Sequence, residues 1–207
     1  MIWAIILAAG ESRRMGKQKL LLPFGEKTMI ETVIDNAVQS KVDEVLVVLG
    51  SGAEKIAEKI KSSFLEKSLS KKKHVKTTVN PEFRQGMLSS IQWGVKSLPE
   101  DTRAALVMLG DQPLIPGSVI DKIVDAHKQT QKGIVLPVYN KKRGHPILID
   151  MKYRDEVKRI SPDTGLRALV HNHAEDILEI EVDVPGVLRD IDTVEDYNQV
   201  LSEEKKT

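Results

Sequence analysis

Two groups of charged side chains in the sequence are of the types that bind phosphate groups and divalent cations. The first group follows an apolar run: residues 7–19 combine small residues such as Gly10 with the cations Arg14 and Lys19. Small residues let a ligand approach the backbone, whose N–H groups bind phosphate oxygens together with arginine and lysine. Taken alone, this composition favours a tight turn followed by a solvated basic stretch. The glycine spacing matches neither a dinucleotide fingerprint nor a Walker A loop.

The second group consists of aspartates that follow predicted strands. Asp111 comes directly after the apolar run 104–109, at the strand end where open α/β sheets bind ligands. Magnesium takes one or two carboxylates together with waters and phosphate oxygens, so a single aspartate here suits it, although a turn-capping role is an equal alternative. Asp190 and Asp192 are two residues apart and therefore share one side of an extended segment. One of them can instead be the N-cap of the helix that follows.

Strands and helices alternate along most of the chain and position these side chains. Apolar runs predict strands at 2–7, 44–49, 75–79, 104–109 and 134–138, and helical periodicity predicts helices at 28–40, 53–65, 87–98 and 119–128. Such alternation indicates an α/β fold with a Rossmann-like, doubly wound, mainly parallel sheet. After Tyr139 the pattern changes. A strand at 146–149, two short helices, a strand at 177–182 and a closing helix at 194–201 indicate a small C-terminal subdomain or sheet extension.

Composition excludes several classes of protein. The 207 residues carry a formal net charge of +1, which argues against a nucleic-acid partner or a membrane surface, and they include no cysteine for a disulfide or thiolate metal site. The apolar start is too short to span a bilayer, so a cytoplasmic location is expected. The segment Ser68 to His74 is expected to be solvated, and His127, His171 and His173 fit no metal motif and are interpreted as surface residues.

Residues 7–19 read L-A-A-G-x-S-x-R-M-G-x-x-K, and this pattern resembles the opening of the MobA-like nucleotidyltransferases, in particular the molybdenum cofactor cytidylyltransferases. Further similar blocks follow in the order of that family and cover nearly the whole chain: 20–25, 79–91, 110–113, 143–146, 163–167 and 190–193. The resemblance implies one domain over residues 1–207, of the nucleotidyltransferase type. Residues 1–140 would form its nucleotide-binding part, and residues 141–207 the part that binds the acceptor and closes the site.

The resemblance also implies roles for individual residues. Arg14, Lys19 and Asp111 would be catalytic, and Mg²⁺ would bind Asp111 and Asp192, with Asp190 as the rival second ligand. Arg143, His145, Asp163 and Arg167 would face the acceptor, although a histidine next to proline is equally often structural. The nucleotide would be bound by Leu7, Ala8, Ala9, Gly10, Arg14, Lys19, Asn80, Gly86, Ser90 and Asp111.

The reaction implied by the resemblance is transfer of CMP from CTP to the terminal phosphate of molybdopterin, with release of pyrophosphate. Guanine-using relatives carry glycine where this chain has Ala9, which favours CTP over GTP without excluding ATP. A molybdenum hydroxylase would receive the product. Two alternatives are a nucleotidyltransferase with another phosphorylated acceptor, such as a sugar phosphate or small alcohol phosphate, and a non-catalytic carrier of the cofactor.

Overall fold

The strand β1 (Ile2–Ala8) lies at the centre of the fold, in a computed structural model that describes residues 1–65 and 74–204. Its side chains alternate between two hydrophobic clusters on opposite faces of the sheet: Ala4 and Ile6 belong to one cluster, Trp3 and Ile5 to the other. Both faces are therefore covered, as a continuously apolar strand predicts. Of the segment expected to be solvated, residues 68–73 lie outside the described ranges.

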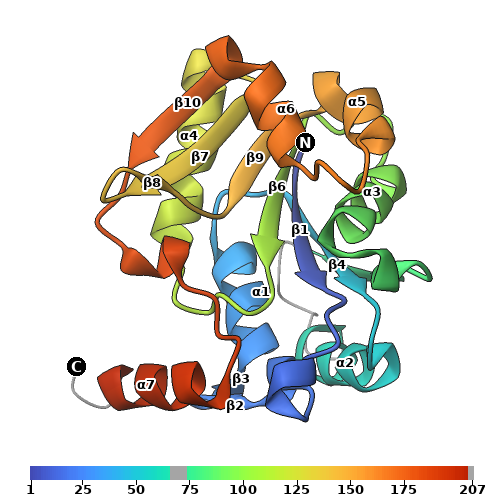
Figure 1. Ribbon diagram of the computed structural model, residues 1–207, viewed down its shortest axis with the longest axis vertical. Helices are drawn as coiled ribbons and strands as arrows, with labels where there is room; N and C mark the ends of the chain where they lie inside the picture. The colour runs from blue at the N-terminus through green and yellow to red at the C-terminus, as the bar shows by residue number, and fades with distance from the viewer. Residues whose placement is uncertain (66–73, 205–207) are drawn as a thin grey trace.

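The sheet is mainly parallel, which confirms the predicted fold class (Figure 1). From one edge to the other its order is β10 (Ile177–Glu181), β7 (Ile134–Tyr139), β9 (Ile147–Asp150), β6 (Ala104–Leu109), β1, β4 (Glu44–Leu49) and β5 (Val75–Val79), with β8 (Lys142–Arg143) paired to β7. A separate two-stranded ribbon pairs β2 (Pro23–Phe24) with β3 (Lys27–Thr28).

The strand β9 is the main departure from a parallel sheet. It runs antiparallel to both β6 and β7 and lies between them, in the body of the sheet. The connection from β7 through β8 is short, and a short connection allows only an antiparallel return. Of the two arrangements expected after Tyr139, the structure therefore has the sheet extension.

Helices cover both faces of the sheet (Figure 1). Side chains of α1 (Met29–Gln39), α2 (Ala53–Ile60), α4 (Gly117–Thr130) and α7 (Val194–Glu204) pack into one cluster, and those of α3 (Met87–Ser97), α5 (Arg154–Arg159) and α6 (Arg167–Asn172) into the other. The helix predicted at 53–65 remains α-helical to Ile60 and continues to Leu65 as a wider π-turn. None of the helices in the described ranges has the length and apolar character needed to span a bilayer.

One surface prediction was wrong. His127 is completely buried, because the buried stripe Ile120, Ile123 and Val124 of α4 continues one turn further to this residue. Its Nδ1 lies 3.0 Å from the carbonyl oxygen of Lys132, which supplies a polar partner inside the core. His171 is exposed as expected, and His173 is half-buried, with its ring stacked on Tyr153.

Candidate active site

The site forms where the carboxyl ends of β1, β4 and β6 meet. Backbone hydrogen bonds hold the three strand ends in register: Gly110 N–H donates to the Leu7 carbonyl at 2.9 Å, and Ser51 N–H donates to the Ala9 carbonyl at 3.1 Å. Residues 9–18, which follow β1, therefore lie beside Asp111, which follows β6. This juxtaposition is the one expected from the position of ligands in open α/β sheets.

Lys19 joins two carboxylates that are far apart in the sequence. Its Nζ lies 2.6 Å from Oδ2 of Asp111 and 2.7 Å from Oδ1 of Asp192. Burial by itself lowers the pKa of Lys19, but the two aspartates raise the pKa overall above its usual value. The pKa of Asp192 is lowered, since burial, which raises it, is outweighed by Lys19 and Arg14. The ammonium is therefore fixed as a cation between the carboxylates of Asp111 and Asp192.

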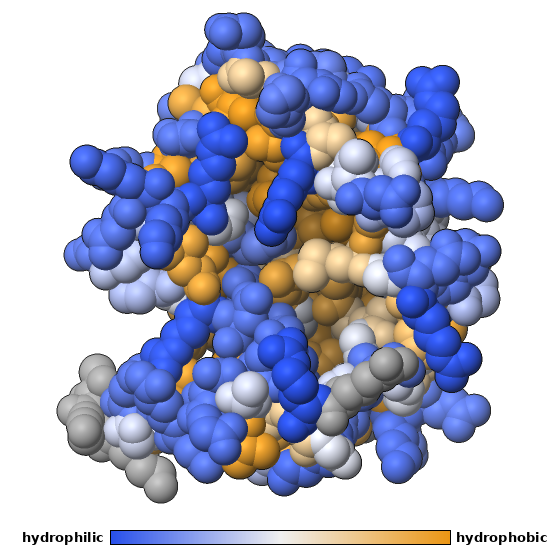
Figure 2. All heavy atoms as spheres, viewed as in Figure 1, coloured by the Kyte–Doolittle hydropathy of each residue, from blue (hydrophilic) through white to orange (hydrophobic). Residues whose placement is uncertain are grey.

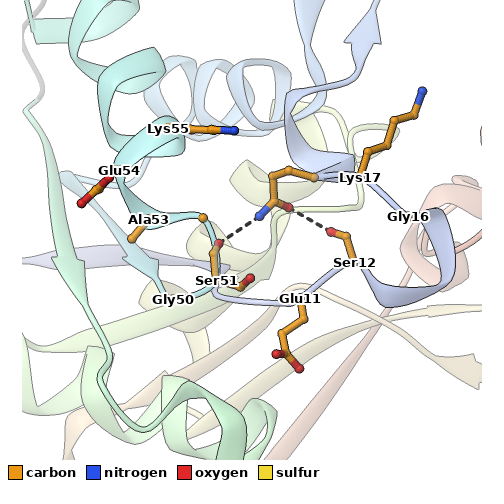
Figure 3. Close-up of a pocket in the computed structure, with 11 residues that line it drawn as sticks. Glu11, Ser12, Gly16, Lys17, Gly50, Ser51, Ala53, Glu54 and Lys55 are labelled. Carbon is orange, nitrogen blue, oxygen red and sulfur yellow. Dashed lines mark hydrogen bonds between the residues drawn. The ribbon is translucent and has the colours of Figure 1, made fainter.

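The backbone around Lys19 is anchored by polar contacts as well as by burial of Leu20. The Lys19 N–H donates to Oγ of Ser12 at 3.2 Å, and the Gln18 side chain accepts from Ser12 and donates to the Ser51 carbonyl at 2.9 Å. Figure 3 shows this link between Ser12 and Ser51, and it shows the side chain of the exposed Lys17 pointing away from the link. Lys17 and Lys19 thus have opposite environments, because only Lys19 belongs to the 3₁₀ turn Lys19–Leu21, where it is buried.

The aspartates 190 and 192 have different partners. Asp192 also binds Arg14, whose NH2 lies 2.7 Å from Oδ2. Asp190 instead accepts a hydrogen bond from Gln112 at 2.6 Å, and burial together with the charge of Asp111 raises its pKa. Asp192 therefore shares a cation with Asp111, whereas Asp190 lines the smaller of the two cavities beside them and is bound to Gln112.

A divalent cation fits between Asp111 and Asp192. The Lys19 ammonium already lies at hydrogen-bond distance from both carboxylates, so this is a place that favours positive charge. Within the described residues, no group of three or more His, Cys, Asp or Glu side chains could hold a metal. The remaining ligands would have to be phosphate oxygens and waters, which is the coordination that Mg²⁺ prefers.

Two adjoining cavities of about 480 and about 380 Å³ open beside these carboxylates. Residues that line both are Leu7, Gly10, Glu11, Arg14, Arg84, Asp111 and Asp192. The smaller cavity is also lined by Ala9, Gly86 and Ser90, while Lys19 lines the larger. Ala8 and Asn80 are buried behind the lining. The Asn80 amide donates to Ser90 Oγ at 3.1 Å and so orients that hydroxyl.

The predicted acceptor residues do not line these two cavities. Arg143 is exposed on β8 and pairs with Glu179 of β10 at 2.6 Å, and both Asp163 and Arg167 are exposed around the start of α6. His145 is mostly buried and precedes a cis peptide bond to Pro146. Burial lowers its pKa below the usual value, although Val107 and Asp111 act in the opposite direction. Figure 2 shows a hollow lined with hydrophobic atoms in the centre of this face of the molecule.

Several residues of the site were not predicted from the sequence. Arg84 and Glu11 line both cavities, and Gln18 and Gln112 orient the residues beside them. Arg84 lies between Asn80 and Gly86, both of which belong to the motifs of the resemblance. The feature of the sequence that could have indicated Arg84 is the position of a cationic residue between two residues expected to bind the nucleotide.

The model of the MobA-like NTP transferase domain matches residues 4–177. The chain belongs to this family. It is therefore a nucleotidyltransferase, and a solved relative in complex with manganese points to a divalent metal in the family's chemistry. Asp190 and Asp192 lie beyond the matched residues.

Among individual MobA-like proteins, the molybdenum cofactor cytidylyltransferase of Escherichia coli K12 is 28% identical over 93% of this chain and 92% of its own length. The nicotine blue oxidoreductase of Paenarthrobacter nicotinovorans is 26% identical over 97% of this chain and 96% of its own length. Rv0371c of Mycobacterium tuberculosis H37Rv superimposes with a TM-score of 0.79, at 27% identity over 97% of both chains, and has also been solved with manganese, with a TM-score of 0.75. The two named activities differ, so identity alone does not fix the substrate.

Proposed function

We propose that the enzyme transfers CMP from CTP to the terminal phosphate of a molybdopterin-type cofactor and releases pyrophosphate, with Mg²⁺ bound by Asp111 and Asp192. The observation that carries the proposal is the Lys19 ammonium held between these two carboxylates at the edge of the sheet. The likeness to a molybdenum cofactor cytidylyltransferase over nearly the full length of both chains supports the choice of acceptor.

The charges of the site suit in-line attack on the α-phosphorus. A bound Mg²⁺ would neutralise phosphate oxygens during the transfer. Lys19 and Arg14 would hold the phosphates and stabilise the negative charge that develops on the departing pyrophosphate. Gly10 lets the backbone approach the phosphates closely, because it is exposed and carries no side chain.

The acceptor requires no general base. A phosphate monoester has its second pKa near 6, so the attacking oxygen is already ionised at neutral pH. This suits a site in which none of the described histidines lines the two cavities, and burial lowers the pKa of His145. By the family resemblance, Arg143, His145, Asp163 and Arg167 are assigned to the acceptor. The apolar hollow in the centre of the face shown in Figure 2 offers a surface for a flat ring system.

The choice of CTP rests on the small cavity. Ser90, oriented by Asn80, would hydrogen-bond the base, and the Ala9 side chain would narrow the space available to it. Ala9→Gly should therefore enlarge this space and increase the use of purine nucleotides relative to CTP. If the wild type already uses GTP as well as CTP, this account of selectivity is wrong.

The decisive experiment is incubation with molybdenum cofactor, Mg²⁺ and each nucleoside triphosphate in turn, with mass analysis of the product and a pyrophosphate assay. The proposal expects a cytosine dinucleotide of the cofactor and one pyrophosphate per product. If CMP is transferred only to a sugar phosphate or a small alcohol phosphate, that compound class and not molybdopterin is the acceptor. Binding of the cofactor without release of pyrophosphate under any condition would favour a carrier.

A further inference from the structure

Among the residues that the structure describes, Arg84 is a cation of the site for which only long contacts are seen. It belongs to the short 3₁₀ turn Phe83–Gln85, and its side chain is 78% exposed. Its Nε lies 3.7 Å from Oε1 of Glu11, which is longer than a hydrogen bond, and its guanidinium lies 5.3 Å from the ring centre of its own neighbour Phe83. Arg84 is thus held near the site without being fixed in it.

The other two cations of the site each contact a carboxylate at hydrogen-bond distance. Lys19 and Arg14 contact Asp111 and Asp192 at 2.6 to 2.7 Å, so two positive charges balance two negative ones. The larger cavity is lined by three cationic and three anionic side chains. Arg84 is the third cation, and Glu11 is the third anion. A triphosphate adds more negative charge than one divalent cation neutralises. Arg84, whose side chain is largely exposed, is the cation of the lining that can move to balance it.

The position of Arg84 indicates which part of the ligand it meets. The smaller cavity contains the residues expected around the base, such as Gly86 and Ser90, and Arg84 comes from the same segment of chain. Arg84 also lines the larger cavity, whose other lining residues include Gly10, Ser12 and Arg14 of the loop after β1. It therefore extends from the base side toward the loop expected to hold the phosphates.

We propose that Arg84 exchanges its long contact with Glu11 for the β- and γ-phosphates of the nucleotide, and so binds the pyrophosphate that leaves. This inference rests on the proposed nucleotidyl transfer but not on the identity of the base or acceptor. Guanidinium groups bind phosphate oxygens through two parallel N–H donors, which suits a side chain with free donors facing a cavity. Glu11 holds the guanidinium near the site in the absence of nucleotide and competes with phosphate for it.

The test is calorimetric binding of CTP, CMP and inorganic pyrophosphate, each with Mn²⁺, to the wild type and to Arg84→Gln, Arg84→Lys and Glu11→Gln. Arg84→Gln should weaken CTP and pyrophosphate by about tenfold or more, the loss typical of a hydrogen bond to a charged group, and leave CMP unchanged. Arg84→Lys should recover part of the loss. Glu11→Gln should bind pyrophosphate more tightly, because the competing carboxylate is removed.

Lys17→Gln is the matched control, since Lys17 is an exposed cation of the same loop that lines neither cavity. An Arg84→Gln variant that behaves like Lys17→Gln would overturn the inference while leaving the proposed function intact. Equal weakening of CTP and CMP would also overturn it, because Arg84 would then shape the base side only. A wild type that binds no nucleoside triphosphate and no pyrophosphate would overturn both this inference and the proposed function.

Discussion

At the scale of single residues, the Lys19 ammonium occupies the place expected for a divalent cation. Both are attracted by Asp111 and Asp192, and without nucleotide they compete. Lys19→Met keeps much of the apolar stem and removes the charge. We expect it to bind Mn²⁺ about tenfold more tightly in the absence of nucleotide, since removing a cation near two carboxylates favours another by at least ~1.4 kcal/mol. Titration followed by electron paramagnetic resonance measures this, with Lys17→Met as control.

The same substitution should reduce turnover. Loss of one preorganised electrostatic donor typically costs about 2.7–4 kcal/mol in the transition state. Tighter metal binding together with slower transfer would separate competition from catalysis. An unchanged Mn²⁺ affinity in Lys19→Met would show that the ammonium and the metal use different places.

The three aspartates are expected to differ in importance. Asp111→Asn and Asp192→Asn each remove a proposed metal ligand and should slow transfer by roughly a thousandfold, with the fold intact. Asp190→Asn should be much milder, because Asp190 is bound to Gln112 and does not share the Lys19 ammonium with Asp111. Steady-state kinetics at several Mg²⁺ concentrations compares the three. A severe loss of activity in Asp190→Asn, without one in Asp192→Asn, would show that Asp190 and not Asp192 is the second metal ligand.

At the scale of structural elements, Gly10 and Gly50 are needed for different reasons: open space for a ligand beside Gly10, and close packing of two loops at Gly50. A Cβ at Gly10 would meet no atom within 4 Å, whereas a Cβ at Gly50 would lie 2.7 Å from Cβ of Phe83 and 2.8 Å from Ala9. Gly10→Ala should therefore keep its melting temperature but lose CTP affinity, because the methyl group enters the space of the phosphates. Gly50→Ala should lose about 1–3 kcal/mol of stability, since the loops after β1 and β4 must separate. Thermal melting with CTP titration tests the pair. Equal melting losses would show that the space beside Gly10 is not the binding site.

Glu31 connects three elements and should make stability depend on pH. Its carboxylate accepts from Thr28 before α1, and contacts Lys59 of α2 and Ser63 of the following π-turn. Burial raises the pKa of Glu31, but these hydrogen bonds lower it overall to about 2. A depressed folded-state pKa stabilises the protein above the unfolded pKa, and the effect is lost as the pH falls from about 5 to about 2. Glu31→Gln should flatten that part of the pH profile by ~2–3 kcal/mol in chemical denaturation. An identical profile in both proteins would contradict this.

At the scale of the whole molecule, ligand binding should stabilise both ends of the described chain. Ion pairs join residues 14 and 19 to residue 192, so a nucleotide bound at the proposed site would bridge the two segments. At about a hundred times its dissociation constant, CTP with Mn²⁺ should add ~2.7 kcal/mol, which raises the melting temperature of a protein of this size by about 5–10 °C. Asp111→Asn should show little of this shift. Hydrogen exchange should slow in both segments together, and protection confined to residues 10–19 would contradict the bridge.

The sequence predicted the parts of the fold that depend on local pattern. Continuous apolar strands such as β1 and β6, and the helix stripes between them, followed directly from periodicity and were confirmed. The position of β9 in the sheet could not be predicted from periodicity, because pairing between distant strands leaves no local pattern in the sequence. His127 was misread for a similar reason: its burial comes from the face of α4 that packs on the sheet. In the site, the aspartates and Lys19 could be proposed from the sequence, but the contacts among them are tertiary and leave no local pattern.

The contact between Lys19 and Asp192 has a consequence for synthesis of the protein. Domains fold as units while the chain emerges from the ribosome, N-terminal part first. A nascent chain that has reached residue 177 contains every residue of the family match, including Lys19 and Asp111, but not yet Asp192. In such a chain Lys19 can pair with Asp111 alone. The second carboxylate arrives with the last part of the chain, and only then does the cell hold a complete site.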